Sequence, residues 1–184
     1  MAPPRRTLVR STAALLAAGA AVAGCSAQPG TAATVNDTRI TENEVASATA
    51  QWIEISGQQV TPGQVAHILV QAELFEPIAT EGGFGYSDQQ VEQLLKDAAA
   101  AQGQPAPEEI SEPAVDLARF VLQQGDVTEA QNAGELLSQL DEATAEADIE
   151  VNPRYGTRND SGQIVQTTYE WIHQEQQPTP APAG

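Results

Sequence analysis

Apolar residues recur every three to four positions along most of the chain, and this spacing predicts a mainly helical domain. The predicted helices begin at Thr41, Thr61, Ser87, Ser111 and Thr128. Most of these residues are followed three positions later by Glu or Gln, the pattern of a capping box. Stop signals are also present: Pro77 should bend or end the second helix, Gly103 should stop the third, and Gly125 should follow the fourth. In the fourth helix, Val115, Ala118, Val121 and Leu122 are expected to face inward, and the fifth should run to Ala147.

Two short segments show the alternation of a strand. Residues 33–35 and 38–40 flank Asn36-Asp37, a pair that tolerates left-handed backbone geometry, so a tight β-hairpin or one bent strand is predicted. Residues 149–151 form a second short strand that ends at Asn152-Pro153. We expect this strand to share a small sheet or core with Val35 and Ile40, which joins the two chain ends. The predicted fold class is therefore α+β, mainly α, with about five helices and a small sheet.

The N-terminus has the pattern of an export signal. Arg5, Arg6 and Arg10 precede a small apolar run over residues 12–24, which is shorter than the roughly 18 residues that a bilayer span requires. The run ends in V-A-G-C, which resembles the lipobox of bacterial lipoproteins, and Cys25 is the only cysteine in the chain. The resemblance implies that residues 1–24 are a signal peptide and that Cys25 is acylated after cleavage. An ordinary signal peptide with a chance cysteine is the alternative.

The composition of the two ends of the chain predicts where the folded domain begins and ends. Residues 25–33 are small and polar and are predicted to be a tether, and residues 173–184 are predicted to be a disordered tail rich in Pro and Gln. The folded domain is thus expected over residues 34–172. Its surface should be strongly acidic, because the whole chain carries 25 Asp and Glu against eight Lys and Arg, a net charge of −17.

This charge argues against nucleic acid as a partner, since phosphate binding needs clustered Lys and Arg. The single cysteine excludes an internal disulfide, and two histidines without close partners do not suggest a metal site. No pattern of a nucleophile, a paired-carboxylate site or a phosphate-binding loop stands out. We therefore predict no enzyme activity, no catalytic residue and no cofactor.

Both ends of the domain resemble one family. Residues 31–45, T-A-A-T-V-N-D-T-R-I-T-E-N-E-V, are similar to the start of SurA-type and PrsA-type secreted chaperones, where a strand leads into the first helix. Residues 146–157, E-A-D-I-E-V-N-P-R-Y-G-T, resemble the end of the same SurA N-terminal domain, where a strand and N-P-R-Y-G follow a helix. The resemblance implies an envelope protein that binds unfolded or exported polypeptide.

Some members of that family carry an inserted parvulin domain, a peptidyl-prolyl isomerase. Residues 66–70, A-H-I-L-V, look like the opening strand of a parvulin, but the surrounding spacing predicts helix. Residues 82–85, G-G-F-G, come too early for the parvulin turn, and residues 169–173 lack the expected glycine. An isomerase is the least favoured of the three interpretations.

The favoured hypothesis is a lipid-anchored protein on the extracytoplasmic face of the cell membrane, with a non-catalytic, chaperone-like domain for protein folding. An alternative is a scaffolding lipoprotein with one fixed envelope partner. Candidate polypeptide-binding residues are Trp52, Phe75, Phe84 and Tyr86, because a chaperone needs exposed apolar surface. Trp52 and Phe75 also fit a core, since they lie at helical spacing with other apolar residues.

Overall fold

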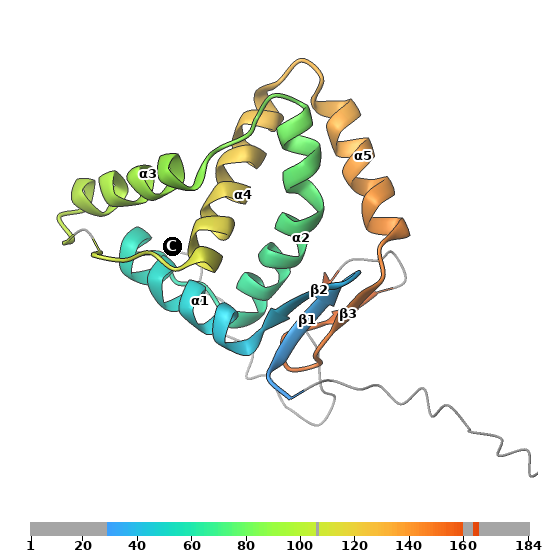
Figure 1. The fold of residues 1–184 in the computed structure, drawn as a ribbon, viewed down its shortest axis with the longest axis horizontal. Helices are drawn as coiled ribbons and strands as arrows, with labels where there is room; N and C mark the ends of the chain where they lie inside the picture. The colour runs from blue at the N-terminus through green and yellow to red at the C-terminus, as the bar shows by residue number, and fades with distance from the viewer. Residues whose placement is uncertain (1–28, 106, 160–163, 166–184) are drawn as a thin grey trace, which may run out of the picture.

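A computed structural model describes residues 29–105, 107–159 and 164–165 (Figure 1). The predicted signal peptide, Cys25 and the predicted tail lie outside the described residues. The helices are α1 (Glu42–Ser56), α2 (Pro62–Glu81), α3 (Asp88–Ala101), α4 (Glu112–Glu129) and α5 (Ala133–Glu146). The strands are β1 (Thr31–Val35), β2 (Thr38–Thr41), β3 (Ile149–Val151), β4 (Thr157–Arg158) and β5 (Ile164–Val165). The predicted mainly helical α+β class is confirmed.

The sheet joins the two ends of the domain as predicted. Its order is β2-β1-β3 with antiparallel pairing, and Val35 lies opposite both Thr38 and Ile149. Asn36 adopts a left-handed conformation with a φ of 52°, which allows the tight turn between β1 and β2. The β1 strand begins at Thr31, so three residues assigned to the tether belong to the sheet. Their small side chains suggested a linker, but Ala32 and Ala33 are buried in the core.

The segment N-P-R-Y-G after β3 packs against the N-terminal parts of the domain. Asn152 donates from its backbone to Ala32 O and from Nδ2 to Thr31 O, at 2.9 and 3.0 Å. Arg154 forms an ion pair of 3.3 Å with Glu42 in the first turn of α1. A Cβ at Gly63 would lie 2.9 Å from Tyr155 O, so glycine allows this turn to approach α2 closely. The two family-like segments are therefore adjacent in space.

Capping boxes begin the first three helices as predicted, at Thr41, Thr61 and Ser87. The second helix does not end at Pro77, because α2 continues to Glu81 and Ala79 in its last turn is buried. The fourth helix likewise passes through Gly125, since the buried Val127 holds one further turn.

The predicted start of the fifth helix at Thr128 is wrong. The Thr128 hydroxyl donates to Gln124 O within α4, and α5 begins at Ala133. The expectation that Val121 faces inward is also wrong, since this side chain is exposed. The first error concerns the junction of α4 and α5, where polar residues with good helix propensity give no sharp stop signal.

Three apolar clusters stabilise the fold. The largest lies between the sheet, α1 and α2, and includes Val35, Val45 and Val70. A second lies between α1, α3 and α4 around Val91 and Val115. The third lies between α2, α4 and α5. In Figure 1, α3 and α5 therefore lie on opposite sides of the central pair formed by α2 and α4.

Candidate functional site

Phe75, a candidate polypeptide-binding residue, lies in the core. It is 1% exposed, and its ring contacts that of Phe120 edge to face, with 5.7 Å between centroids and an interplanar angle of 74°. Such a pair adds about 0.5–1.5 kcal/mol to the free energy of burial. Phe75 is thus part of the packing between α2 and α4 and offers no surface to a partner, because its helical spacing places it on the inner face.

The other predicted aromatic residues are half-buried and lie in different clusters. Trp52 packs against both the first and the second apolar cluster. Phe84 packs against the third cluster, whereas Tyr86 packs against the second. The Tyr86 hydroxyl donates to the Asp126 carboxylate, and this hydrogen bond raises the pKa of the phenol. These residues do not form the single exposed patch that the chaperone hypothesis predicted.

Large exposed apolar side chains are scattered in the described part of the chain. They are Leu94, Val121, Leu137 and Val165, on α3, α4, α5 and β5. Isolated apolar residues of this kind are common on soluble proteins. The exposed apolar side chains of the described residues therefore do not form one broad apolar surface.

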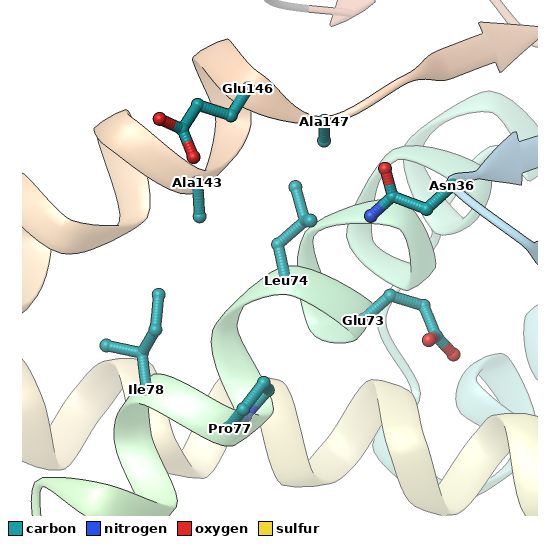
Figure 2. Close-up of a pocket in the computed structure, with 8 residues that line it drawn as sticks. All are labelled: Asn36, Glu73, Leu74, Pro77, Ile78, Ala143, Glu146 and Ala147. Atoms are coloured by element: carbon teal, nitrogen blue, oxygen red, sulfur yellow. The ribbon is translucent and has the colours of Figure 1, made fainter.

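A solvent-open groove lies between α2 and α5, next to the turn that joins β1 and β2 (Figure 2). Its volume is about 470 Å³, within the range of about 300–1,000 Å³ typical of small-molecule sites. It is lined by Asn36, Glu73, Leu74, Pro77, Ile78, Ala143, Glu146 and Ala147. The lining combines an apolar floor with one carboxamide and two carboxylates, so the groove can contact apolar, hydrogen-bonding and cationic groups together.

Asn36 is fixed at one side of the groove by the chain segment after α5. Its backbone N–H donates to Asp148 O at 2.7 Å, and its Oδ1 accepts from the Asp148 N–H at 3.0 Å. With Oδ1 engaged in this way, Nδ2 points toward the groove (Figure 2). The turn residue thus presents a positioned hydrogen-bond donor to any occupant.

Glu73 carries its charge in an unfavourable environment. Burial raises the pKa of its carboxyl, and the neighbouring carboxylates of Asp116, Glu76 and Glu44 raise it further, whereas a hydrogen bond with Thr38 opposes this rise. No basic side chain in the described ranges forms an ion pair with Glu73. A cation that entered the groove would relieve this repulsion.

Glu146 is the last residue of α5 and is exposed. Arg158 lies at the same end of the helix, where its guanidinium donates to Thr144 O at 2.8 Å and to Ala147 O at 3.5 Å. This arginine therefore caps the helix carbonyls and also moderates the local negative charge. Of the two carboxylates at the groove, Glu73 is the less compensated.

Arg119 on α4 gathers a second set of carboxylates near α2 and α3. It is 6% exposed and pairs with Asp116 at 2.6 Å, with Glu76 at 3.6 Å and with Asp88 at the start of α3. Burial raises the pKa of Asp116, while the hydrogen bond and charge of Arg119 oppose that shift. The arrangement joins three helices through one cation, so its clearest role is to hold α3 on the domain.

His67 lies within α2, so the A-H-I-L-V segment is helical, as its spacing predicted. Burial lowers the pKa of this half-buried imidazole, which favours its neutral form. Across the described residues, no group of three or more His, Cys, Asp or Glu is arranged to hold a metal ion. No helix within those ranges is long and apolar enough to cross a membrane.

No sequence pattern predicted the groove. Glu73 and Glu146 are exposed acidic residues among many others, and only the packing of α2 against α5 brings them to one surface feature. A usable signal was present, since a sheet or core shared by Val35, Ile40 and residues 149–151 implies that the Asn36 turn lies beside the end of the last helix, as the observed pairing of β1 with β3 has it. Comparisons with protein-family models, curated proteins and solved structures find no match to this chain.

Proposed function

We propose that this chain is an extracytoplasmic lipoprotein, anchored to the cell membrane through Cys25, whose helical domain binds polypeptide in a chaperone-like, non-catalytic manner. The observation that carries the proposal is the pairing of β1 with β3, which brings the segments 31–45 and 146–157 together. This adjacency supports the resemblance to SurA-type and PrsA-type domains, because their first and last segments should then belong to one structural unit.

The α2–α5 groove adds a second line of support. A polypeptide-binding domain needs a concave surface that accepts side chains and hydrogen-bonds a backbone, and the groove offers both types of contact. No catalytic nucleophile or acid–base pair is needed for this role. Binding in the groove is compatible with release of the bound segment, since the groove is open to solvent.

A scaffolding lipoprotein with one fixed partner is a second candidate. It is favoured by the burial of Phe75 and by the separation of Trp52, Phe84 and Tyr86 into different clusters. A domain that accepts many unfolded chains is expected to expose a larger continuous apolar surface. The breadth of sequences that the domain accepts therefore distinguishes the two roles.

The anchor is tested by substitution of the thiol. We expect Cys25→Ser to abolish lipid attachment and normal processing, because a hydroxyl does not replace the thiol as the acylation site. Mass spectrometry of the protein from membrane fractions measures the outcome. Absence of lipid on the unsubstituted N-terminus would contradict the anchor.

Polypeptide binding is tested by the effect of the purified protein on aggregation of a denatured model protein. We expect suppression of aggregation at near-stoichiometric ratios, with no acceleration of prolyl isomerisation in a peptide substrate. Suppression for several unrelated clients supports the chaperone role, and binding to one envelope protein alone supports the scaffold. Catalysed isomerisation would contradict both and favour a parvulin-type activity.

A further inference from the structure

The α2–α5 groove has an apolar floor with room above it. Leu74, Pro77 and Ile78 supply this floor from α2, and Ala143 and Ala147 face it from the α5 side (Figure 2). The alanines end at Cβ, so their size leaves the groove open where larger side chains would fill it. A volume of about 470 Å³ accommodates a few side chains of a peptide and is too small for a folded domain.

The charged groups of the groove lie apart from one another. Figure 2 shows the carboxylate of Glu146 on the α5 side of the groove, whereas the Glu73 side chain extends to the opposite rim, with its carboxylate pointing away from Leu74 and Ala143. Oxygen ligands of a metal ion must surround one point, so this separation does not suit a single ion bound by both groups. It suits cationic side chains that extend from an occupant whose apolar part rests on the floor, in the way that Lys and Arg combine an apolar stem with a charged head.

We propose that the groove binds a polypeptide segment in which apolar side chains adjoin Lys or Arg. This inference rests on the proposed function and specifies its ligand. The apolar side chains enter between α2 and α5, basic side chains reach Glu73 and Glu146, and Asn36 Nδ2 donates to a backbone carbonyl of the segment. The net charge of −17 adds attraction for a basic segment and repulsion for an acidic one.

Glu73 and Glu146, at the two ends of the groove, should contribute unequally to the binding of a basic segment. Glu73 is surrounded by further carboxylates, and a basic side chain placed there lowers their mutual repulsion. Glu146 ends the helix whose last carbonyls Arg158 caps, and the positive charge of this arginine reduces the attraction for a cation at that end. Loss of the charge at Glu73 should therefore weaken binding more than loss of the charge at Glu146.

The first test measures binding of fluorescent peptides to the purified full chain by anisotropy. The probes are three otherwise identical dodecapeptides with a central Lys-Leu-Leu-Lys, Gln-Leu-Leu-Gln or Glu-Leu-Leu-Glu sequence. We expect affinity to fall in that order. The variant E73Q/E146Q should bind the Lys peptide about tenfold more weakly, since each rim carboxylate contributes under about 1 kcal/mol.

A matched control removes the same charge from the same two helices outside the groove. The variant E81Q/E142Q alters exposed carboxylates of α2 and α5 that do not line the groove. It should retain the affinity of the unsubstituted protein for the Lys peptide within about twofold, as expected for distant surface charges in moderate salt. Equal weakening by both double variants would overturn the groove as the site.

The second test fills the groove. Ala143→Trp places a large side chain on its floor, and Ala145→Trp places the same side chain at an exposed position of α5. We expect only the first to abolish binding of the Lys peptide, with circular dichroism establishing that both variants fold. If the unsubstituted protein binds no peptide, the proposed function fails. If it binds all three peptides equally and Ala143→Trp has no effect, the groove inference alone fails.

Discussion

Two acidic regions of this domain use the same residue types in opposite ways. Around Arg119, the carboxylates of Glu76, Asp88 and Asp116 converge on one buried cation. In the α2–α5 groove, Glu73 and Glu146 have no ion-pair partner among the described residues and remain open to solvent. In the first region the negative charge of the carboxylates is compensated by Arg119. In the second region the carboxylates are not paired with a cation and can interact with a ligand.

The difference indicates which acidic residues support the fold and which support binding. Removing one partner of a buried pair leaves an uncompensated charge and destabilises the protein strongly. Removing an exposed carboxylate has little effect on folding and acts chiefly on what binds there. The two regions are adjacent, because Asp116 and Glu76 also raise the pKa of Glu73. Substitution of the buried Arg119 should therefore act chiefly on stability, and substitution of the exposed Glu73 and Glu146 chiefly on binding.

The largest expected effect is on stability at the Arg119 cluster. Arg119→Met should lower the free energy of unfolding by about 1–3 kcal/mol, because Asp116, the least exposed of the three carboxylates, stays partly desolvated without its cation. Urea denaturation measures the loss. The control Lys96→Met removes a half-buried cation paired with Glu92 at 3.6 Å, and should cost at most about 1 kcal/mol. Similar losses in the two variants would contradict the structural role assigned to Arg119.

Asn36 contributes both to the stability of the turn and to binding in the groove, so its substitution should affect the unfolding free energy and the peptide affinity moderately. Asn36→Gly retains the left-handed turn but removes the bond from Asp148 N–H to Oδ1, and should cost about 1 kcal/mol of unfolding free energy. The affinity for the Lys peptide should fall by about threefold, since a donor to the backbone is lost. Unchanged affinity would place the peptide away from this turn.

Salt should separate the two regions further. Raising the NaCl concentration should weaken binding of the Lys peptide by about threefold, because screening acts on the exposed carboxylates. The buried Arg119 cluster should be affected less, so the unfolding midpoint should change little. Anisotropy and thermal unfolding over the same salt series test this. A peptide affinity that does not depend on salt would argue that only apolar contacts hold the peptide.

The smallest expected effect is on thermal stability at Glu73. Its pKa is raised in the folded state above the ordinary value of 4.5, so the native protein binds the proton more tightly and loses stability as pH rises through this range. Glu73→Gln should thus raise Tm at pH 7 by about 1 °C, a modest value because solvent screens the group. The gain should vanish near pH 4, where the unsubstituted side chain is protonated in both states. A larger gain at pH 4 than at pH 7 would contradict this cause.

Much of the fold follows from local signals in the sequence. The capping residues Thr41, Thr61 and Ser87 begin helices because their side chains bond a backbone N–H three residues on. Strand alternation also predicted that Val35 and Ile40 share a small sheet or core with Ile149 and Val151, and in the structure Val35 lies opposite Ile149. The predicted helix boundaries at Gly125 and Thr128 are wrong, because packing of the neighbouring apolar residues decides whether a helix continues.

The candidate site was less predictable for a physical reason. Exposed aromatic residues were expected to bind polypeptide, but aromatic burial is so favourable that Phe75 lies in the core. The groove depends on the approach of α5 to α2 and on where small alanines leave space, which is a property of packing. Individual acidic residues in a chain with 25 of them carry no signal of this arrangement.

A charge exchange between the groove and its ligand tests the central claim most directly. In a double-mutant cycle, Glu73→Lys is combined with the Lys-Leu-Leu-Lys and Glu-Leu-Leu-Glu peptides, and all four affinities are measured by anisotropy. We expect Glu73→Lys to weaken binding of the Lys peptide and to strengthen binding of the Glu peptide, with a coupling energy of about 1 kcal/mol or more. A coupling energy of zero, with both peptides changed alike, would contradict the claim that the α2–α5 groove recognises basic side chains.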